Sequence, residues 1–341
     1  MPSKSSLNLL KKLTETPGVS GFEEKVRKVL EREFKKYCDP VSVDKVGNLI
    51  GRKGRGKKKL MVVCHMDEVG MVVSNIDADG LLHFVKIGFI SDVILLAQDI
   101  FIWGKKGPVP GIIGVNEEQE LGKNIKAANM FIDVGAKSRR EVEKMGIEIE
   151  SQVTFTTASH VVGKSFIGKA LDNRVGCYVL VEVMKKVKPN CTVYFVANAV
   201  EEVGLKGAQV STFKIDPDAA IVVDVSNAED FPAGHETHIR LGGGPVLVLV
   251  EAGGEGLITD MRIKELFMRT AKKLGIKVQL EVSSHDAVSE GTTIQLTREG
   301  VPTGAINIPI RYPHSVSSIA NIDDINDTVK LLCDIIKNFK V

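Results

Sequence analysis

Several residues that could bind metal ions are spread along this chain of 341 residues, and each follows or ends an apolar run. In open α/β sheets, side chains that do chemistry come from the carboxyl ends of the strands, so this placement favours a shared site. If one carboxylate bridges two metal ions, a small number of side chains can bind both ions. Sites with two metal ions are typical of hydrolases. The candidate ligands are His65, Asp172, Glu202, Asp224 and His314.

Two further acids, Glu201 and Asp67, lie next to these candidates in the sequence. Glu201 and its neighbour Glu202 close the apolar run 192–199, where a solvated helix face is not expected. One carboxylate of the pair can bind a metal while its neighbour acts as a general base. A general base needs a raised pKa, and the negative charge of an adjacent carboxylate raises the pKa of a glutamate. Asp67 follows His65 by two residues, which places both on the same side of an extended chain. Asp67 could then accept from the second imidazole nitrogen, as metal-bound histidines require.

Each candidate also has a purely structural interpretation. His65 and Asp67 could be polar residues at a strand end, and Asp224 could be another. Asp172 could cap the helix that follows it, since aspartate is a favoured N-cap residue. His314, after Arg311-Tyr312-Pro313, could lie in a surface loop.

Two rival motifs are weaker. His235-Glu236-Thr237-His238 has its histidines three residues apart, whereas a zincin helix needs them four apart. Gly242-Gly243-Gly244 has neither the strand-to-helix setting nor the Lys-Ser/Thr ending of a phosphate-binding loop. We therefore expect no nucleotide site.

Composition excludes several classes of protein. The net charge of +2 and the single tryptophan do not favour nucleic acid or an anionic membrane as a partner. No apolar run is long enough to span a bilayer, and the N-terminus lacks a secretory segment. The five cysteines form no CxxC motif and lie in apolar segments, which is typical of buried thiols in a reducing compartment. A cytoplasmic enzyme is expected.

The periodicity of the chain predicts two kinds of structure. Helix and strand patterns alternate in residues 1–69 and again in residues 162–341, which predicts an α/β fold with a mostly parallel sheet covered by helices. Residues 70–161 have short runs rich in Val and Ile with frequent Gly and Pro breakers, which predicts an inserted all-β domain shaped as a small barrel. Ser20-Gly21-Phe22-Glu23 matches a capping box before a helix that runs to about Tyr37.

Taken together, these residues resemble the cytosolic M42 family of metallo-aminopeptidases. The similarity extends in family order from near residue 18 to the C-terminus, and the matches together are highly specific. The motifs that carry it are His65-Met66-Asp67-Glu68-Val69-Gly70, Phe131-Ile132-Asp133-Val134-Gly135-Ala136, Ala170-Leu171-Asp172-Asn173-Arg174, Glu201-Glu202-Val203-Gly204-Leu205-Lys206-Gly207-Ala208, Asp224-Val225-Ser226, Gly300-Val301-Pro302-Thr303-Gly304 and Arg311-Tyr312-Pro313-His314-Ser315.

The resemblance implies a role for each candidate. One ion would be held by His65, Asp172 and Asp224, and the other by Asp172, Glu202 and His314, with Asp172 as the bridge. Glu201 would be the general base on a water between the ions, and Asp67 would orient His65. The insertion would be a PDZ-like dimerisation domain, and dimers would assemble into a hollow tetrahedron of twelve subunits.

The sequence departs from the family pattern where it has Val200 before the glutamate pair and Thr293 after Gly291-Thr292. The loop 111–120 also lacks a histidine that is common in the family. None of these departures removes a ligand or the base. They leave the preferred N-terminal residue of the substrate open.

The leading interpretation is an aminopeptidase with two divalent ions, zinc or cobalt, acting on short peptides. His and carboxylate ligands would suit manganese as well. One alternative is a glycoside hydrolase of the endoglucanase type that uses Glu201 and Glu202 as acid and base, although the histidines would then have no role. A second alternative is a non-catalytic assembly protein. A chelator test, or assay of aminoacyl p-nitroanilides with added metal, separates these alternatives.

Overall fold

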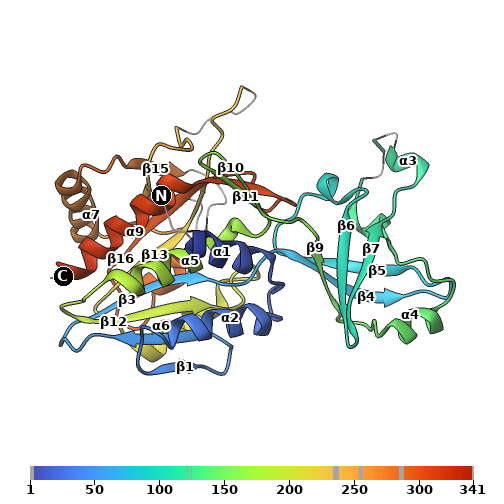
Figure 1. Ribbon diagram of the computed structural model, residues 1–341, viewed down its shortest axis with the longest axis horizontal. Coiled ribbons are helices and arrows are strands. Elements are labelled where there is room, and N and C mark those ends of the chain that lie inside the picture. Colours follow the sequence, from blue (N-terminus) through green and yellow to red (C-terminus); the bar gives the residue numbers. More distant parts are fainter. Residues whose placement is uncertain are drawn as a thin grey trace.

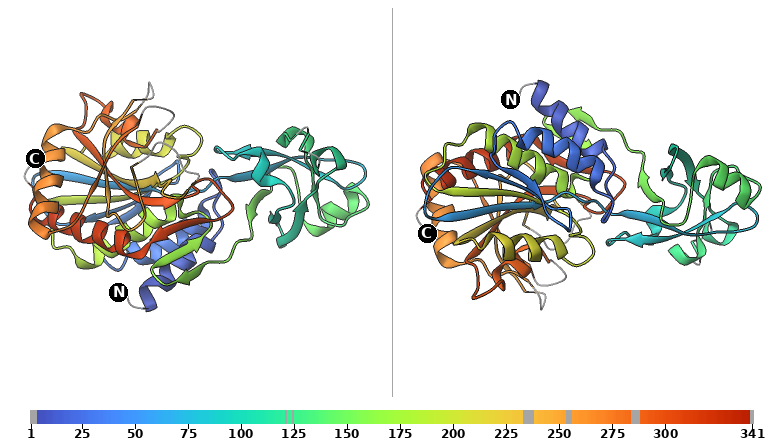
Figure 2. Two further views of the ribbon diagram at one scale, coloured as in Figure 1. Left: turned by 90° about the horizontal axis from the view of Figure 1, so that it is seen from above. Right: turned by 90° about the horizontal axis from the view of Figure 1, so that it is seen from below.

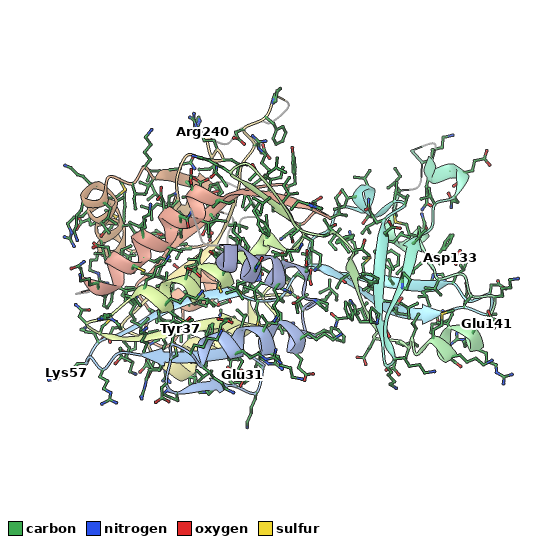
Figure 3. The ribbon with its side chains drawn as sticks, in the orientation of Figure 1. Glu31, Tyr37, Lys57, Asp133, Glu141 and Arg240 are labelled. Carbon is green, nitrogen blue, oxygen red and sulfur yellow. The ribbon has the colours of Figure 1, made fainter. Side chains whose placement is uncertain are left out.

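The molecule has a large α/β body with a small β-barrel attached at one end (Figure 1; Figure 2). The computed structural model describes residues 4–120, 122–123, 125–232, 238–252, 256–283 and 288–339. Charged side chains project outward at the two far ends, as Lys57 on the large body and Glu141 on the barrel illustrate (Figure 3).

One sheet of eleven described strands forms the centre of the large body. Its four middle strands, in the order β12, β3, β13 and β16, run parallel, whereas the flanking strands pair antiparallel apart from β14 with β15. The sheet is therefore mixed, and the predicted parallel arrangement applies to its centre. The strands are β1 (Val41–Val43), β2 (Leu49–Lys53), β3 (Lys59–His65), β10 (His160–Val162), β11 (Ser165–Gly168), β12 (Thr192–Asn198), β13 (Ala219–Asn227), β14 (Val246–Glu251), β15 (Gln279–Ser283), β16 (Thr303–Arg311) and β17 (Ser318–Asn321).

Helices cover both faces of this sheet (Figure 1). The larger of its two main apolar cores receives side chains from α1 (Lys4–Glu15), α2 (Glu24–Phe34), α5 (Leu171–Lys186), α7 (Met261–Leu274) and α9 (Ile322–Lys337). The smaller core, on the opposite face, receives side chains from α6 (Lys206–Ile215) and α8 (Gly291–Gln295). Among the described residues, no helix is both long and apolar enough to cross a membrane.

Strand β3 is apolar along its length because it is buried on both faces. Leu60, Val62 and Cys64 enter the larger core, whereas Met61 and Val63 enter the smaller one. This continuous apolar run is what a central parallel strand requires. Because the middle strands are parallel, they end at one edge of the sheet, which is where the polar residues that follow them are gathered.

The insertion is a closed antiparallel barrel with its own apolar core, as the sequence predicts. The strand β10 that follows the barrel pairs in the large sheet. We therefore propose that the junction lies within residues 156–159, before the sequence-based boundary at 161. The barrel contains strands β4 (Gly70–Ile76), β5 (Leu82–Ile87), β6 (Asp99–Gly104), β7 (Gly107–Ile113), β8 (Ile132–Asp133) and β9 (Gln152–Phe155), with the short helices η1 (Asp92–Leu95), α3 (Glu117–Glu120), η2 (Ala127–Asn129) and α4 (Arg139–Met145).

The predicted capping box is wrong. Helix α2 begins at Glu24, and Glu23 occupies the N-cap position without a side-chain cap. The Ser20 hydroxyl donates instead to Asp67 Oδ2 at 2.6 Å. A hydrogen bond to a charged carboxylate is stronger than one between neutral groups, so the contact with Asp67 fixes the position of Ser20 outside the helix.

We predict that Phe195→Ala destabilises the protein by about 3–5 kcal/mol, because Phe195 is 0% exposed on β12 and its removal leaves a cavity in the larger core. Chemical denaturation at fixed protein concentration measures this. Phe213→Ala is the matched control, since Phe213 is 58% exposed. Its loss should be about 1 kcal/mol or less. Equal losses for the two variants would contradict the assignment of the core.

Candidate metal centre

The predicted ligands converge at the edge of the sheet where the middle strands end. His65 is the last residue of β3, and Asp224 lies on β13. Glu201 and Glu202 follow shortly after β12, Asp172 lies at the start of α5, and His314 follows β16. Five segments that are distant in sequence therefore contribute to one cluster, and four of them come from parallel strands that end on the same side.

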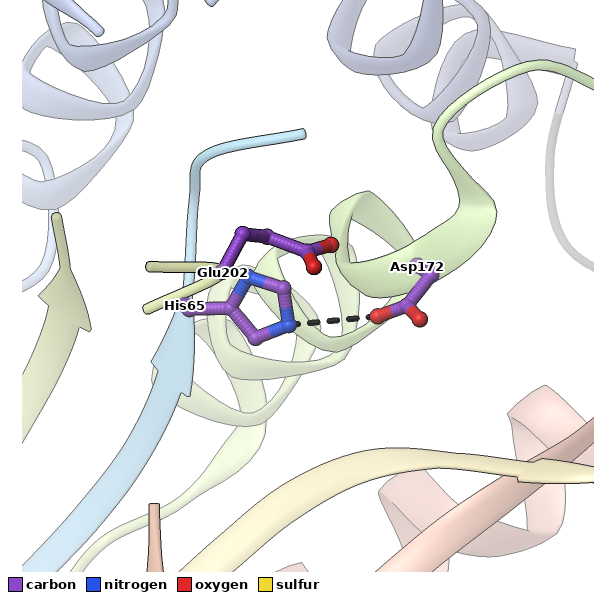
Figure 4. Close-up of side chains that lie close together, drawn as sticks. All are labelled: His65, Asp172 and Glu202. Atoms are coloured by element: carbon purple, nitrogen blue, oxygen red, sulfur yellow. Dashed lines mark hydrogen bonds and ion pairs between the residues drawn. The ribbon is translucent and has the colours of Figure 1, made fainter. Parts of the chain in front are cut away.

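Asp172 lies between the two histidines. Its Oδ1 atom is 3.1 Å from His65 Nε2 and its Oδ2 atom is 3.1 Å from His314 Nε2. Figure 4 shows the His65 ring facing Asp172, with the Glu202 carboxylate beside the ring. A carboxylate that directs one oxygen to each imidazole has the arrangement of a bridging ligand.

The remaining carboxylates are close to the same two imidazoles. Glu202 Oε2 is 3.5 Å from His314 Nε2. Asp224 Oδ1 and Glu201 Oε2 are 3.7 Å and 4.0 Å from His65 Nε2. All five predicted ligands and the predicted base therefore lie in one cluster.

Two sets of potential ligand atoms stand out in this cluster. The ligand atoms of His65, Asp172 and Glu202 all lie within 4.8 Å of one another, and so do those of His65, Glu201 and Asp224. The residue common to these two sets is His65, whereas the family resemblance makes Asp172 the residue that both ions share. The division between two ions therefore stays a prediction.

Asp67 has a broader role than the sequence indicates. Its Oδ1 atom lies 3.4 Å from His65 Nδ1 without a hydrogen bond. Its two oxygens instead accept the backbone amides of Glu201 and Glu202, each at 3.2 Å. Because Asp67 is fully buried, water does not compete for these two bonds, and they fix the backbone of the glutamate pair. No spacing rule links Asp67 to residues more than a hundred positions away.

Other supporting residues were also missed. Asn173 is buried, and its Nδ2 atom donates to the carbonyl of Val223 at 2.9 Å, which ties the start of α5 to the strand that carries Asp224. Asn173 Oδ1 accepts the amide of Gly176 at 3.0 Å and so makes the capping bond, whereas both oxygens of Asp172 face histidines. The structural alternative proposed for Asp172 is therefore excluded.

A buried ion network lies beside the cluster. Glu68 contacts both the Lys169 ammonium and, at 3.4 Å, the Arg174 guanidinium. Arg174 is fully buried and also donates to the carbonyls of Leu13 and Thr16 at 2.6 and 2.7 Å. Three segments of the chain are thereby held together around the start of α5.

The direction of the pKa shifts indicates that negative charge exceeds positive charge in this cluster. Burial raises the pKa of Glu202 to about 8, and the Asp172 carboxylate adds to the shift. Burial, together with Glu202 and Asp224, also raises the pKa of Glu201 well above its usual value. Burial alone would lower the pKa of His314, but Asp172 raises it to about 9. The side chains thus retain protons that a divalent cation would replace.

The donor set fits a divalent metal ion. Imidazole nitrogens and carboxylate oxygens are the ligands of zinc, cobalt and manganese sites. Glu202 Oε1 is buried without a hydrogen-bond partner among the described residues, so it has unused capacity to bind a cation.

The two rival motifs have different outcomes. His235, Glu236 and Thr237 lie outside the described residues, so the zincin interpretation is not tested. The backbone amides of Gly242 and Gly244 donate to the two oxygens of Asp324, at 2.7 and 2.8 Å. These amides already hold a carboxylate of the chain itself, which excludes the phosphate-loop interpretation.

Comparisons with known proteins find relatives along the whole chain. A family model described as M42 glutamyl aminopeptidase matches residues 47–331, and a model described as AMPT matches residues 4–30. A putative aminopeptidase of Acetivibrio thermocellus is 40% identical over 98% of this chain and 100% of its own length.

Two solved structures have the same fold along the whole chain. The TET aminopeptidase from Thaumarchaeota archaeon SCGC AB-539-E09 has a TM-score of 0.93 and 33% identity, covering 99% of this chain and 98% of its own. The TET1 peptidase of Pyrococcus horikoshii, which can assemble into a tetrahedron or a large octahedral shell, has a TM-score of 0.87 and 29% identity, covering 98% and 100%.

We predict that Asp172→Asn reduces the divalent metal content to one ion or none per subunit, because an amide cannot supply two anionic oxygens to the two histidine-centred positions. Elemental analysis after gel filtration measures this. Asp323→Asn, at an exposed residue paired with Lys164, serves as the control and should keep the wild-type content. Unchanged content in Asp172→Asn would show that Asp172 is not a ligand.

Proposed function

The chain belongs to the M42 family of glutamyl aminopeptidases and is a peptide-bond hydrolase, and we propose that it removes N-terminal residues from short peptides with the help of two divalent ions. The observation that supports two ions best is the position of Asp172, whose two oxygens each face a different histidine at 3.1 Å.

His65, Asp172 and Asp224 would hold one ion, and Asp172, Glu202 and His314 the other. Zinc and cobalt are the proposed metals, since the donors are two imidazoles and three carboxylates. When bound, such ions polarise the scissile carbonyl and make water acidic enough to attack it at neutral pH.

Glu201 is the proposed general base. Its carboxylate lies in the cluster but is the farthest of the four acids from a histidine nitrogen, at 4.0 Å. Burial and neighbouring Glu202 raise its pKa above the ordinary value for a glutamate, which makes its carboxylate a stronger base. Glu201 takes the proton of the attacking water and then returns it to the amine of the departing peptide.

Asp67 is proposed to position the base and a ligand together. Because it accepts the amides of both Glu201 and Glu202, it fixes the direction in which their side chains leave the backbone. It also lies beside His65 Nδ1, where a carboxylate favours the tautomer that leaves Nε2 free to bind a metal.

We predict that Glu201→Gln lowers kcat by about 10²–10⁴-fold while both ions are retained, since a carboxamide cannot accept the proton but no ligand is removed. Hydrolysis of aminoacyl p-nitroanilides and elemental analysis measure the two effects. Glu265→Gln, on the exposed side of α7, is the control and should behave like wild type. Activity within a few-fold of wild type would exclude Glu201 as the base.

The same assays exclude the competing functions. A chelator should abolish activity and added Zn²⁺ or Co²⁺ should restore it, whereas a glycosidase that uses two carboxylates needs no metal. Failure of the wild-type protein to cleave any aminoacyl substrate with metal bound would contradict the proposed function itself.

We propose that the subunits form a closed homo-oligomer, a tetrahedral dodecamer, with the barrel at subunit contacts. The barrel exposes several large apolar side chains, among them Phe89 at 84% and Val93 at 57%, and such groups gather at interfaces. A closed shell would admit short peptides and exclude folded proteins.

Light scattering coupled to gel filtration should therefore give a mass near twelve times 37.1 kDa. Assembly is expected because each barrel buries its exposed apolar side chains by contact with another subunit. A monomer at micromolar concentration would contradict assembly, and a dimer would support only the role of the barrel.

A further inference from the structure

We propose that the inserted barrel forms one wall of the metal centre and that Gly88 in the barrel is a positioning residue for Glu202. The inference rests on the proposed function, because it takes Glu202 as a ligand. It extends that function by making the barrel part of the site as well as a unit of assembly.

Gly88 follows strand β5 directly, and Ile87 at the end of β5 lies opposite Gly70, where the chain enters the barrel from the large body. A Cβ atom on Gly88 would lie 3.0 Å from Glu202 Oε2 and 2.7 Å from a methyl carbon of Val69. Either contact would force a displacement. The Glu202 carboxylate thus occupies space that any other residue at position 88 would fill.

A second contact joins the barrel to the loop that carries His314. Val316, two residues farther along, packs against the apolar core of the barrel. The Thr157 hydroxyl, in the connector that leaves the barrel, donates to the carbonyl of Val316 at 2.7 Å. The His314 side chain is 33% exposed whereas that of His65 is 2% exposed, so His314 depends more on the attachments of its loop.

A third contact reaches Asp67 through the N-terminal segment. The side-chain oxygen of Gln152, the first residue of β9, accepts the amide of Val19 at 3.3 Å. The next residue, Ser20, donates its hydroxyl to Asp67 at 2.6 Å. The barrel therefore touches the segment that holds Asp67 in place.

These contacts divide the site into two groups. Glu202, His314 and Asp67 are in contact with the barrel or with a segment that it holds. His65, Asp172 and Asp224 are held by the strands and α5 of the large body. A displacement of the barrel would therefore disturb the ion assigned to Glu202 and His314 more than the ion assigned to His65 and Asp224.

The substitution Gly88→Ala tests this directly, and Gly135→Ala is its matched control. Both glycines lie in the barrel and have similar positive φ, 77° and 73°, so alanine strains the backbone equally. A Cβ at Gly135 meets no atom within 4 Å. Any difference between the two variants therefore reports the contact with Glu202 and Val69.

Titration of the metal-depleted proteins with Co²⁺, followed by calorimetry and visible absorption, provides a readout that does not depend on turnover. Wild type should show two binding events. Gly88→Ala should weaken one event by about 10–100-fold and leave the other unchanged, as loss of a supporting contact does at metal sites. Gly135→Ala should match wild type. Identical titrations for the two variants would overturn the proposal.

A rescue variant tests whether the displaced group is the Glu202 carboxylate. Glu202→Asp shortens the side chain and withdraws the carboxylate from position 88. The double variant Gly88→Ala/Glu202→Asp should therefore lose less affinity for the affected ion than the sum of the losses in the two single variants. Fully additive losses would show that Gly88 does not act through Glu202.

Thr157→Val keeps the inference testable if Gly88→Ala does not fold. It removes the hydroxyl that holds Val316 and should weaken the same binding event. Thr156→Val is the control, because the Thr156 hydroxyl bonds only to Asp99 O, within the barrel, at 3.3 Å. Equal behaviour of these variants would refute the barrel as a wall. A wild-type protein that binds no Co²⁺ would instead refute the proposed function.

Discussion

Repulsion among buried carboxylates is the constraint on which the rest of this structure depends. Four acids and two histidines share a site in which burial opposes the ionised form of every acid, and the surrounding carboxylates raise the pKa of both histidines against the effect of burial. Such a cluster is unfavourable for a folded chain unless cations join it. We infer that the surrounding scaffold exists to keep these side chains together against their mutual repulsion.

The scaffold does this with buried polar groups that bond to one another and to the backbone. Asp67 is held by Ser20 and by two backbone amides, and Asn173 links the helix that carries Asp172 to the neighbouring strand. The Glu68–Lys169–Arg174 network adds a buried excess of positive charge next to the acids. These groups come from three separated parts of the chain, near residues 20, 67 and 170, so the site is only as rigid as the packing of the whole body.

The sequence predicted the parts of the fold that depend on short-range pattern. Apolar runs located β3, β12 and β13. The exact helix ends depend on single side chains: helix α7 begins at Met261, where the Asp260 side chain accepts the amide of Arg262. The ligand types could be identified because each follows a strand. The bonds of Asp67, the Ser20 hydroxyl and Gly88 could not, since they join residues whose proximity is decided by tertiary packing.

The adjacent pairing of β4 with β9 has a consequence for how the chain can fold. These two strands are the first and last of the barrel, and Met71 lies opposite Val153. The two ends of the insertion are therefore side by side once the barrel has folded. The entropy of closing a loop depends on the length of chain left flexible, so a barrel that has folded on its own leaves only its short connectors to be ordered. The flanking strands β3 and β10, which lie apart in the large sheet, can then take their places almost as readily as if the barrel were not there.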